Sequence, residues 1–530
     1  MRALKIWLSV GVVGMIAALV MAGHAGRAQG AGQPQMAPAK SDAVVSGLPD
    51  YVEWPLPDAD RAYGAIDGHH IWQYVVEEAE ISHHYRDQGH PQFWGRIIGT
   101  SGDAESAQWL LNKFKKIGMT DTHIQPLDLA PQYIAQSWQV TVNAGGKTLA
   151  LASAQPSEAT PATPPEGLDV EAVYVGLGRE ADFVGRDVRG KAAFVFLSGE
   201  DANFSGEQLA ALKRASKKGA VAIFAVNTLP GNIKVQTYPV DTAVPTFSLV
   251  LKEGQAVRDL IAHAPAGEAP HVKILLNAEM VPNLKSALVW GTLPGATDET
   301  IYVTAHRDGW FDAAGDNGGG VASMVGLAEY FAKVPKSQRR RTMVFIGLDG
   351  HHNSCASEIP SKWCQPGAVG NAWLIAHKAD YFTKTALIIN DEHPSNVGTY
   401  MAGDHSSASV LGRQNSYFPV EWYAGGASRP ALGKIASDAF REFGVTMWAQ
   451  PSPNPPAGDL GGFSQFLPGV SASSDRFFYF HTDGNTPETV PWTGLEAVTR
   501  AYAKIIDQVN KIDLKDLQGQ PSTDTRRPTE

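Results

Sequence analysis

The 530-residue chain contains only two cysteines, Cys355 and Cys364. So few thiols argue against a metal site built from thiolates, which needs several of them. In an oxidising compartment the two cysteines could close a small disulfide loop, and two free, buried thiols are the alternative.

Positive charge is also scarce. The chain has 44 Lys and Arg against 54 Asp and Glu, so its net charge is −10. Nucleic-acid-binding proteins usually carry a basic surface, and we therefore expect no nucleic-acid partner. Beyond the N-terminal segment no apolar run is long enough to span a bilayer, so we expect no membrane contact by the mature chain.

The N-terminus has the pattern of a secretory signal peptide. It reads MRALK, then the apolar run IWLSVGVVGMIAALVM, then the small-residue stretch AGHAGRA. This pattern predicts a signal peptide over residues 1–28, with cleavage after Ala25 or Ala28. An uncleaved membrane anchor is the alternative, because the apolar run approaches the length of a short spanning helix. Cleavage predicts a periplasmic or secreted protein.

Two segments have compositions that do not favour a packed core. Residues 29–60, rich in Ala, Gln and Pro, are predicted to form a linker, and residues 513–530 a disordered polar tail. The length of the chain between them suggests two or three domains.

A Pro/Ala/Thr-rich break at residues 153–167 divides the central part of the chain. Residues 61–150 precede it, and short strands resume over 168–280, which predicts an inserted β-rich domain. From 285 to 512 buried strand runs alternate with loops and a helix. This alternation predicts an α/β sandwich around a mostly parallel sheet.

Polar side chains follow the buried strands of residues 285–512 in a regular way. His306 follows IYVTA, Asp316 lies in the loop AAGDNGGG, His351 and His352 follow RTMVFIGLDG, Asp391 and Glu392 follow TALIIN, and His481 follows RFFYF. Ligand sites in open α/β sheets lie beyond the carboxyl ends of the strands. Imidazole and carboxylate groups are the usual nitrogen and oxygen ligands of zinc, so the sequence predicts a zinc site at this edge.

The order of these motifs resembles the co-catalytic zinc exopeptidases, the family that includes aminopeptidase Y, plasma glutamate carboxypeptidase and prostate-specific membrane antigen. The matching motifs are His306-x-Asp308, Gly315-Asp316-Asn317-Gly318, Asp349-Gly350, Asn390-x-Glu392 and His481-Thr482, together with GRIIGTSGDAESAQWLLNKFKKIGM and GDLGGF. The resemblance implies a three-layer sandwich in which residues 61–150 and 285–512 form one metallopeptidase domain.

The inserted segment 168–280 resembles a protease-associated domain. Gly190 and Lys191 open the strand KAAFVFL, the helix LAALKRASKKG follows, and then come GAVAIFAVN and VPTFSL. In the families that carry it, such a domain is a non-catalytic lid or docking surface.

The same resemblance implies roles for individual residues. His306 would bind one zinc ion and Asp316 would bridge two, while Asp308 would orient the ligands from behind. Glu392 would be the third acidic ligand and His481 the last ligand. Asp391 competes with Glu392, and alternation along a strand predicts that only one of the two points into the site.

The sequence departs from the family at three positions. His351 and His352 replace two consecutive glutamates, of which the first is the general base and the second a metal ligand. His352 can still bind zinc, but it removes one negative charge, so one tightly held ion or a weak second ion is an alternative to a pair. A protonated His351 would meet a repulsion of roughly 4 kcal/mol from one unit charge at about 4 Å. Phe480 replaces a tyrosine that holds the substrate carbonyl in many members.

The leading hypothesis is a zinc-dependent exopeptidase, specifically an aminopeptidase, in which one or two zinc ions activate water and His351 and Asp308 assist catalysis. Its substrates would be peptides or small aminoacyl compounds. One alternative is a catalytically impaired binding protein on a peptidase scaffold. Another is a single-zinc enzyme of the glutaminyl-cyclase type.

Overall fold

The computed structural model describes residues 56–197, 206–229, 231–265, 267–352, 354–355, 365–366, 369–402, 410–417, 421–445, 450–455, 458–474 and 479–518. The predicted signal peptide, most of the predicted linker and Cys364 lie outside these residues. Among the described helices, none is both long and apolar enough to cross a membrane.

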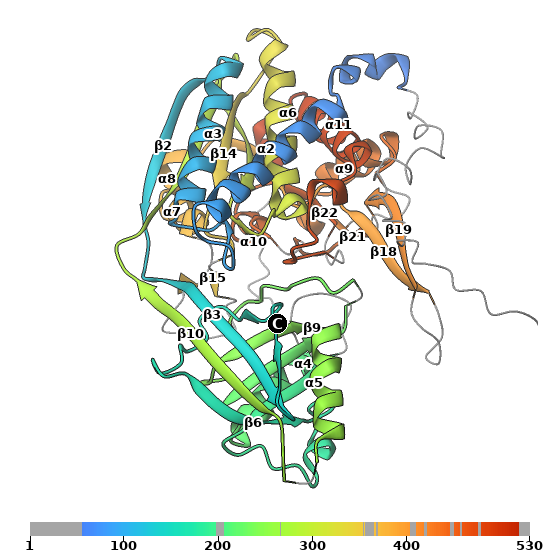
Figure 1. Ribbon diagram of the computed structural model, residues 1–530. Coiled ribbons are helices and arrows are strands. Elements are labelled where there is room, and N and C mark those ends of the chain that lie inside the picture. Colours follow the sequence, from blue (N-terminus) through green and yellow to red (C-terminus); the bar gives the residue numbers. More distant parts are fainter. Residues whose placement is uncertain are drawn as a thin grey trace, which may run out of the picture. The chain divides into compact units, whose positions relative to one another are not determined.

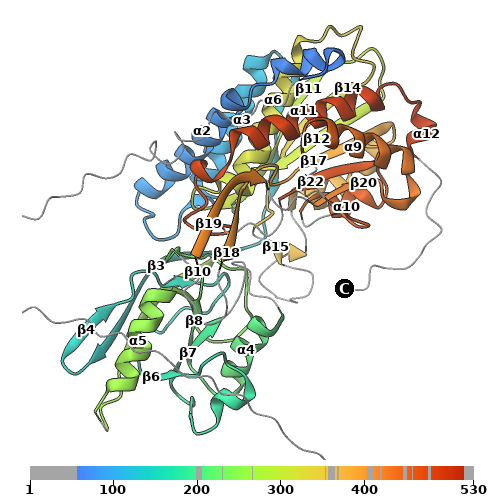
Figure 2. The same cartoon turned by 90° about the vertical axis from the view of Figure 1, so that its right-hand side faces the viewer.

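One eight-stranded sheet forms the centre of the fold (Figures 1 and 2). Its strands run in the order β2 (Thr120–Asp128), β11 (Lys285–Leu293), β14 (Thr342–Leu348), β12 (Thr300–His306), β17 (Thr385–Asp391), β22 (Gly469–Ser473), β20 (Glu421–Ala424) and β21 (Gln450–Pro451). β14, β12, β17 and β22 are parallel, whereas β2, β11 and β20 pair antiparallel with their neighbours. β20 and β21 are also parallel. Four of the seven strand pairs are thus parallel, so the sheet is mostly parallel, as predicted, with antiparallel strands towards its edges.

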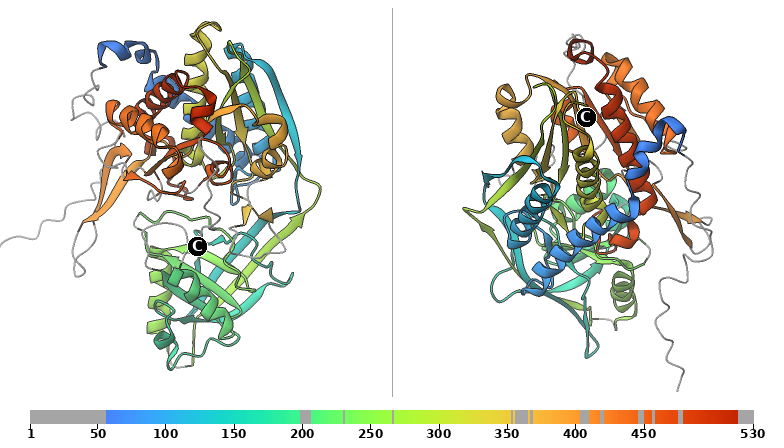
Figure 3. Two further views of the ribbon diagram at one scale, coloured as in Figure 1. Left: turned by 180° about the vertical axis from the view of Figure 1, so that it is seen from behind. Right: turned by 90° about the horizontal axis from the view of Figure 1, so that it is seen from above.

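Helices cover both faces of this sheet, which gives an α/β sandwich of three layers. One face carries α2 (Gly68–Asp87), α3 (Ser101–Ile117), α6 (Gly319–Lys333), α9 (Pro430–Glu442) and α11 (Trp492–Val509), and the other carries α7 (Val369–Ala376), α8 (Lys378–Tyr381) and α10 (Leu460–Ser464). Alternation along β14 shows the division, because Met343 and Phe345 pack in the first core and Val344 and Ile346 in the second. Figure 3 shows α6 and α11 close together over the sheet, in agreement with their contacts.

A second eight-stranded sheet forms the inserted part of the chain. Its order is β4 (Lys147–Ala150), β3 (Gln132–Ala144), β10 (His271–Val281), β6 (Leu168–Tyr174), β7 (Ala192–Leu197), β8 (Ala222–Asn227), β9 (Thr246–Val250) and β5 (Gln155–Pro156). Helices α4 (Gly206–Lys217) and α5 (Leu251–His263) pack on it. The sheet includes strands from Gln132 onwards, because β3 pairs along most of its length with β10.

Short elements complete the described chain. They are the pairs β1 (Gly95–Arg96) with β13 (Gly309–Trp310), β15 (Ser354–Cys355) with β16 (Gln365–Pro366) and β18 (Val397–Ala402) with β19 (Val410–Tyr417), the helical turns η1 (Asp58–Ala65), η2 (Glu180–Phe183), η3 (Ala314–Gly318), η4 (Gly426–Ser428) and η5 (Pro487–Thr489), and α12 (Leu514–Gln518). Helical structure thus enters both the predicted linker, through η1, and the predicted tail, where Leu517 of α12 is buried.

Candidate metal centre

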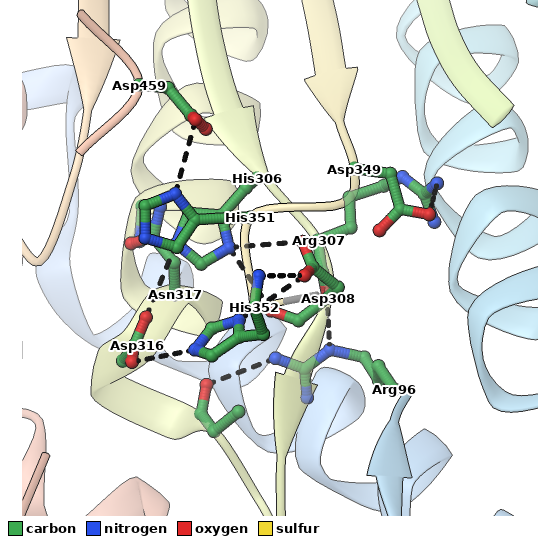
Figure 4. Close-up of polar contacts among 12 residues, drawn as sticks. Arg96, His306, Arg307, Asp308, Asp316, Asn317, Asp349, His351, His352 and Asp459 are labelled. Atoms are coloured by element: carbon green, nitrogen blue, oxygen red, sulfur yellow. Dashed lines mark hydrogen bonds and ion pairs between the residues drawn. The ribbon is translucent and has the colours of Figure 1, made fainter. Parts of the chain in front are cut away.

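Imidazoles and carboxylates gather where the central strands of the sheet end. β12 ends in His306, the chain after β14 presents His352, and Glu392 follows β17 directly. Asp316 lies in η3, and His481 lies in the loop before α11. All five side chains are buried, and they meet in one cluster (Figure 4 shows His306, Asp316 and His352).

The carboxylate of Asp316 lies at the middle of this cluster. Its Oδ1 lies 3.3 Å from Nε2 of His306, and its Oδ2 lies 3.0 Å from Nε2 of His352 and 3.3 Å from Nε2 of His481. Glu392 adds its Oε1 at 3.1 Å from Nε2 of His306. Each oxygen of Asp316 therefore faces its own set of donors, which is the geometry of a carboxylate that bridges two cation sites.

His393 also joins the cluster, although it was not among the predicted site residues. Its Nε2 lies 2.9 Å from Oδ1 of Asp316 and 3.4 Å from Oε1 of Glu392. β17 ends at Asp391, and His393 has a φ of 43°, so the regular alternation of a strand no longer applies there. As a result Glu392 and His393 both face the cluster.

Asp391 does not belong to the cluster. It is fully buried, and the pKa of its carboxyl is raised well above the ordinary value, first by burial and then by the neighbouring Glu392. Its main-chain oxygen accepts a hydrogen bond from Nδ2 of Asn317 at 2.8 Å, which ties the loop carrying Asp316 to the end of β17. Of the two acidic residues after TALIIN, Glu392 is the one near His306.

Asp308 lies behind two of the imidazoles. Its Oδ2 accepts a hydrogen bond from the backbone N–H of His352 at 2.7 Å and lies 3.3 Å from Nδ1 of the same residue. Its Oδ1 lies 3.4 Å from Nδ1 of His306. Because Asp308 faces the Nδ1 atoms, both rings turn their Nε2 atoms towards Asp316. This is how a carboxylate orients imidazole ligands.

His351 has a carboxylate partner of its own. Its Nδ1 lies 3.2 Å from Oδ1 of Asp459, and its ring stacks on that of His306 with centroids 4.3 Å apart (Figure 4). Asp459 also accepts a hydrogen bond from Nδ2 of Asn371 at 2.8 Å. His351 is therefore held beside the cluster by an aspartate.

Gly458 permits a close approach beside Glu392. It has a φ of 128°, and a Cβ at this position would lie 2.8 Å from the Glu392 carboxyl carbon. A larger residue would therefore push against a carboxylate of the cluster. The Gly458-Asp459 pair thus serves two neighbours, since the glycine accommodates Glu392 and the aspartate holds His351.

The pKa values in the cluster follow from burial and from these contacts. Burial lowers the pKa of His352, but Asp316 and Asp308 outweigh that effect and raise it to about 9. Burial lowers the pKa of His481 to about 3. Burial raises the pKa of Glu392, but His306 outweighs it and brings the value to about 2. Anionic carboxylates and a neutral imidazole thus face the same small space.

A network of buried charges supports the cluster from below. The guanidinium of Arg96 lies 2.7 Å from Glu78, and both side chains are fully buried. Arg96 also donates to the main-chain oxygens of Arg307 and Asp312, each at 2.8 Å. It therefore fixes both ends of the loop that contains Asp308.

Three aromatic rings surround the His352 and His481 side of the cluster. Trp310 packs edge-on against both imidazoles at centroid distances of 4.8 Å, and Phe480 stacks on His481 at 3.6 Å. Tyr238, from the inserted part of the chain, meets the ring of His481 edge-on at 4.9 Å. These rings give the cluster an apolar wall.

The cluster suits a divalent cation such as zinc. His306, Asp316, Glu392 and His393 form one group of donors, and Asp316, His352 and His481 form another, with the donor atoms of each group within 4.8 Å of one another. Within the described residues, neither ring nitrogen of the buried His481 has a hydrogen-bond partner. A role of His481 as a metal ligand would explain these unpaired nitrogens, because buried polar atoms normally have partners. Nitrogen and oxygen donors in these numbers match zinc.

Comparisons with known proteins agree with this geometry. Residues 289–506, which include all residues of both donor groups, match peptidase family M28. The fold resembles that of BSAP, a zinc aminopeptidase from Bacillus subtilis, at 16% identity and a TM-score of 0.57, with 85% of this chain and 98% of that chain covered.

Two further solved structures share the fold. A peptidase M28 precursor from Shewanella amazonensis SB2B matches at 16% identity and a TM-score of 0.56, over 85% of this chain and 97% of its own. An aminopeptidase from Aneurinibacillus sp. strain AM-1 matches at 18% identity and a TM-score of 0.51, over 85% and 95%. No curated protein matches the chain. The match to a peptidase family and the fold shared with zinc aminopeptidases support a metallopeptidase, a hydrolase, as the class of this protein.

Proposed function

We propose that the protein is a zinc-dependent exopeptidase, specifically an aminopeptidase, that acts on peptides or small aminoacyl compounds in the periplasm or outside the cell. The observation that carries this proposal is the Asp316 carboxylate, whose two oxygens face two separate sets of donors. The N-terminal signal pattern supports the location. The inserted part of the chain would take the place of a protease-associated domain.

In this proposal bound zinc supplies Lewis-acid polarisation of the substrate carbonyl and lowers the pKa of water. His351 accepts the proton from the attacking water at Nε2, because its Nδ1 faces Asp459. The proton passes afterwards to the leaving amine, as general acid–base catalysis requires. Asp308 keeps the rings of His306 and His352 oriented throughout.

The pairing with Asp459 answers the electrostatic objection to a histidine base. A protonated His351 next to one further cation at about 4 Å would be destabilised by roughly 4 kcal/mol at an effective dielectric constant of about 20. The Asp459 carboxylate lies 3.2 Å from Nδ1 of His351. At the same dielectric constant its attraction is roughly 5 kcal/mol, which offsets the repulsion from one cation.

The test combines metal analysis with a substrate screen. The mature protein, loaded with zinc, is assayed on a library of aminoacyl amides and dipeptides, and its metal content is measured. We expect bound zinc and hydrolysis from the amino end, with both lost in His306→Ala. The control is His84→Ala, which removes an exposed histidine of α2. A protein that binds no metal and hydrolyses nothing would refute the proposal.

The variant His351→Glu/His352→Glu separates two interpretations of the histidine pair. If the histidines work in catalysis as they stand, the double variant loses activity, since Asp459 would then face a glutamate and not an imidazole. If they have impaired an ordinary peptidase, the double variant gains activity. An inactive wild type with an active double variant would favour the binding-protein alternative for the natural chain.

A further inference from the structure

We propose that Tyr238 is a catalytic residue that donates a hydrogen bond from its hydroxyl to the carbonyl oxygen of the scissile bond as this oxygen gains negative charge. The inference rests on the proposed peptidase function and deepens it. It assigns to the inserted part of the chain a role in the chemistry, whereas a lid or docking surface would have none.

The position of the Tyr238 ring supports this role. The ring lies edge-on against His481 at 4.9 Å and against Trp310 at 5.4 Å. Trp310 in turn contacts the rings of His352 and His481, each at 4.8 Å. Tyr238 thus belongs to the wall on the side of the cluster where Asp316 Oδ2 meets His352 and His481.

The hydroxyl of Tyr238 carries a proton that it can donate. The ordinary pKa of a tyrosine hydroxyl is about 10, well above neutral pH. The hydroxyl therefore keeps its proton and can act as a donor. Within the described part of the chain no side chain or main-chain oxygen accepts a hydrogen bond from it, so the donor is available to a substrate.

The backbone holds Tyr238 in register with the loop that carries His481. The N–H of Gln236 donates to the main-chain oxygen of His481 at 3.0 Å, and Val235 pairs with Thr482 in an isolated β-bridge. The N–H of Lys234 donates to Oδ1 of Asp483 at 2.8 Å. A donor fixed in this way costs little reorganisation during the reaction, which is the condition under which such hydrogen bonds accelerate acyl transfer.

Phe480, the residue before His481, lies in the same aromatic wall as Tyr238 but carries no hydroxyl. Its ring stacks on His481 at 3.6 Å and lies 5.6 Å from the ring of His393, so it occupies the opposite part of the same wall. A phenylalanine cannot donate a hydrogen bond. The tyrosine hydroxyl in this wall comes from Tyr238.

The experiment compares Tyr238→Phe with the wild type and with Tyr133→Phe. Tyr133 is the control. It is a buried tyrosine of the inserted part, whereas Tyr238 is partly buried. Within the described residues the Tyr133 hydroxyl has no hydrogen-bond partner and the Tyr133 ring contacts no imidazole of the cluster. All three proteins are loaded with zinc, and their zinc content and thermal stability are measured first. Kinetics on an aminoacyl amide then give kcat and KM.

We expect Tyr238→Phe to lower kcat by about 10²- to 10³-fold, the usual effect of removing one oxyanion donor, with KM and zinc content nearly unchanged. A phosphonate analogue that mimics the tetrahedral oxyanion should bind the variant at least ten-fold more weakly, whereas the product amino acid should bind equally well. Tyr133→Phe should behave as the wild type does.

Three outcomes would overturn the inference in distinguishable ways. An active wild type and an equally active Tyr238→Phe would overturn the role of Tyr238 and leave the peptidase function standing. A wild type that hydrolyses no substrate would overturn both. Loss of zinc or of thermal stability in Tyr238→Phe, with unchanged binding of the phosphonate relative to the product, would show that Tyr238 is a structural residue only.

Discussion

Replacing Asp459 by asparagine should impair catalysis without emptying the metal site. The substitution keeps the shape of the side chain and an oxygen that can accept the hydrogen bond from Asn371. It removes the negative charge that lies 3.2 Å from Nδ1 of His351. The side chain of Asp459 is 2% exposed and that of His351 is 17% exposed, so water screens this pair only in part.

The size of the effect follows from Coulomb's law. At an effective dielectric constant of about 20, unit charges at this separation attract each other by roughly 5 kcal/mol. The charge on His351 develops only as it takes up a proton, so the loss applies to the transition state. Partial screening reduces it to about 3–4 kcal/mol, which corresponds to a decrease in kcat of roughly 10²- to 10³-fold.

The assay is steady-state kinetics of zinc-loaded protein on an aminoacyl amide, together with metal content and thermal melting. Asn371→Ser is the control, because it removes a hydrogen bond to Asp459 but leaves the charge in place. We expect the control to stay within a few-fold of the wild type. If Asp459→Asn retained more than a third of the wild-type kcat with zinc in place, His351 would not be the proton acceptor that its contacts suggest.

Three further predictions concern the metal, the buried charges and the pH dependence. His306→Ala should weaken zinc binding by more than the roughly 10- to 100-fold that is typical when a residue supporting a metal ligand is replaced. Competition with a chelating dye measures the zinc affinity. A zinc affinity equal to that of the wild type would refute the role of His306 as a ligand. Arg96→Met leaves Glu78 buried without its partner, so urea unfolding should show a loss of about 3–5 kcal/mol, and a loss below about 1 kcal/mol would contradict a structural ion pair. Burial raises the pKa of Glu158 from 4.5 to about 8, so its contribution to stability is present below pH 4.5 and is lost as the pH rises through about 8. With the metal removed by a chelator, the free energy of unfolding of Glu158→Gln should therefore rise relative to that of the wild type by on the order of 4–5 kcal/mol between these two pH values. Parallel plots of the free energy of unfolding against pH for the two proteins would refute this.

The position of the candidate site could be predicted because strand ends are visible in the sequence. Buried runs such as TALIIN mark the strands, and the polar residue that follows a parallel strand lies at the sheet edge where ligands bind. This rule finds His306, Glu392 and, through the loop that follows β12, Asp316. It requires only local information.

The parts that were missed depend on contacts between distant residues or on an irregular backbone. Asp459 lies in the motif GDLGGF, which the resemblance matched without assigning a role to this residue, and its pairing with His351 arises only when the chain folds. His393 was missed because the alternation rule assumes that β17 continues, whereas the strand ends at Asp391 and φ becomes positive at His393.

The sequence did not indicate which strands of the central sheet are antiparallel, nor that strands before residue 153 pair with the second sheet, for similar reasons. The buried run SALVWGTL forms β11, but such a run does not tell whether the neighbouring strand runs parallel or antiparallel. The Pro-rich break at residues 153–167 suggested a domain boundary, yet β3 before it pairs with β10 far along the chain. Strand pairing over such a distance leaves no local signal.

The main-chain hydrogen bond from Gln236 to His481 bears on how this protein could have been assembled in evolution or could be shortened by design. An insertion that only sits on a domain can be removed, exchanged or acquired as a module. Here the inserted segment is joined by backbone pairing to the loop that holds a candidate ligand, so its removal would leave that loop without its support. The two sheets therefore constrain each other's sequences, and the smallest unit with an intact cluster contains both of them.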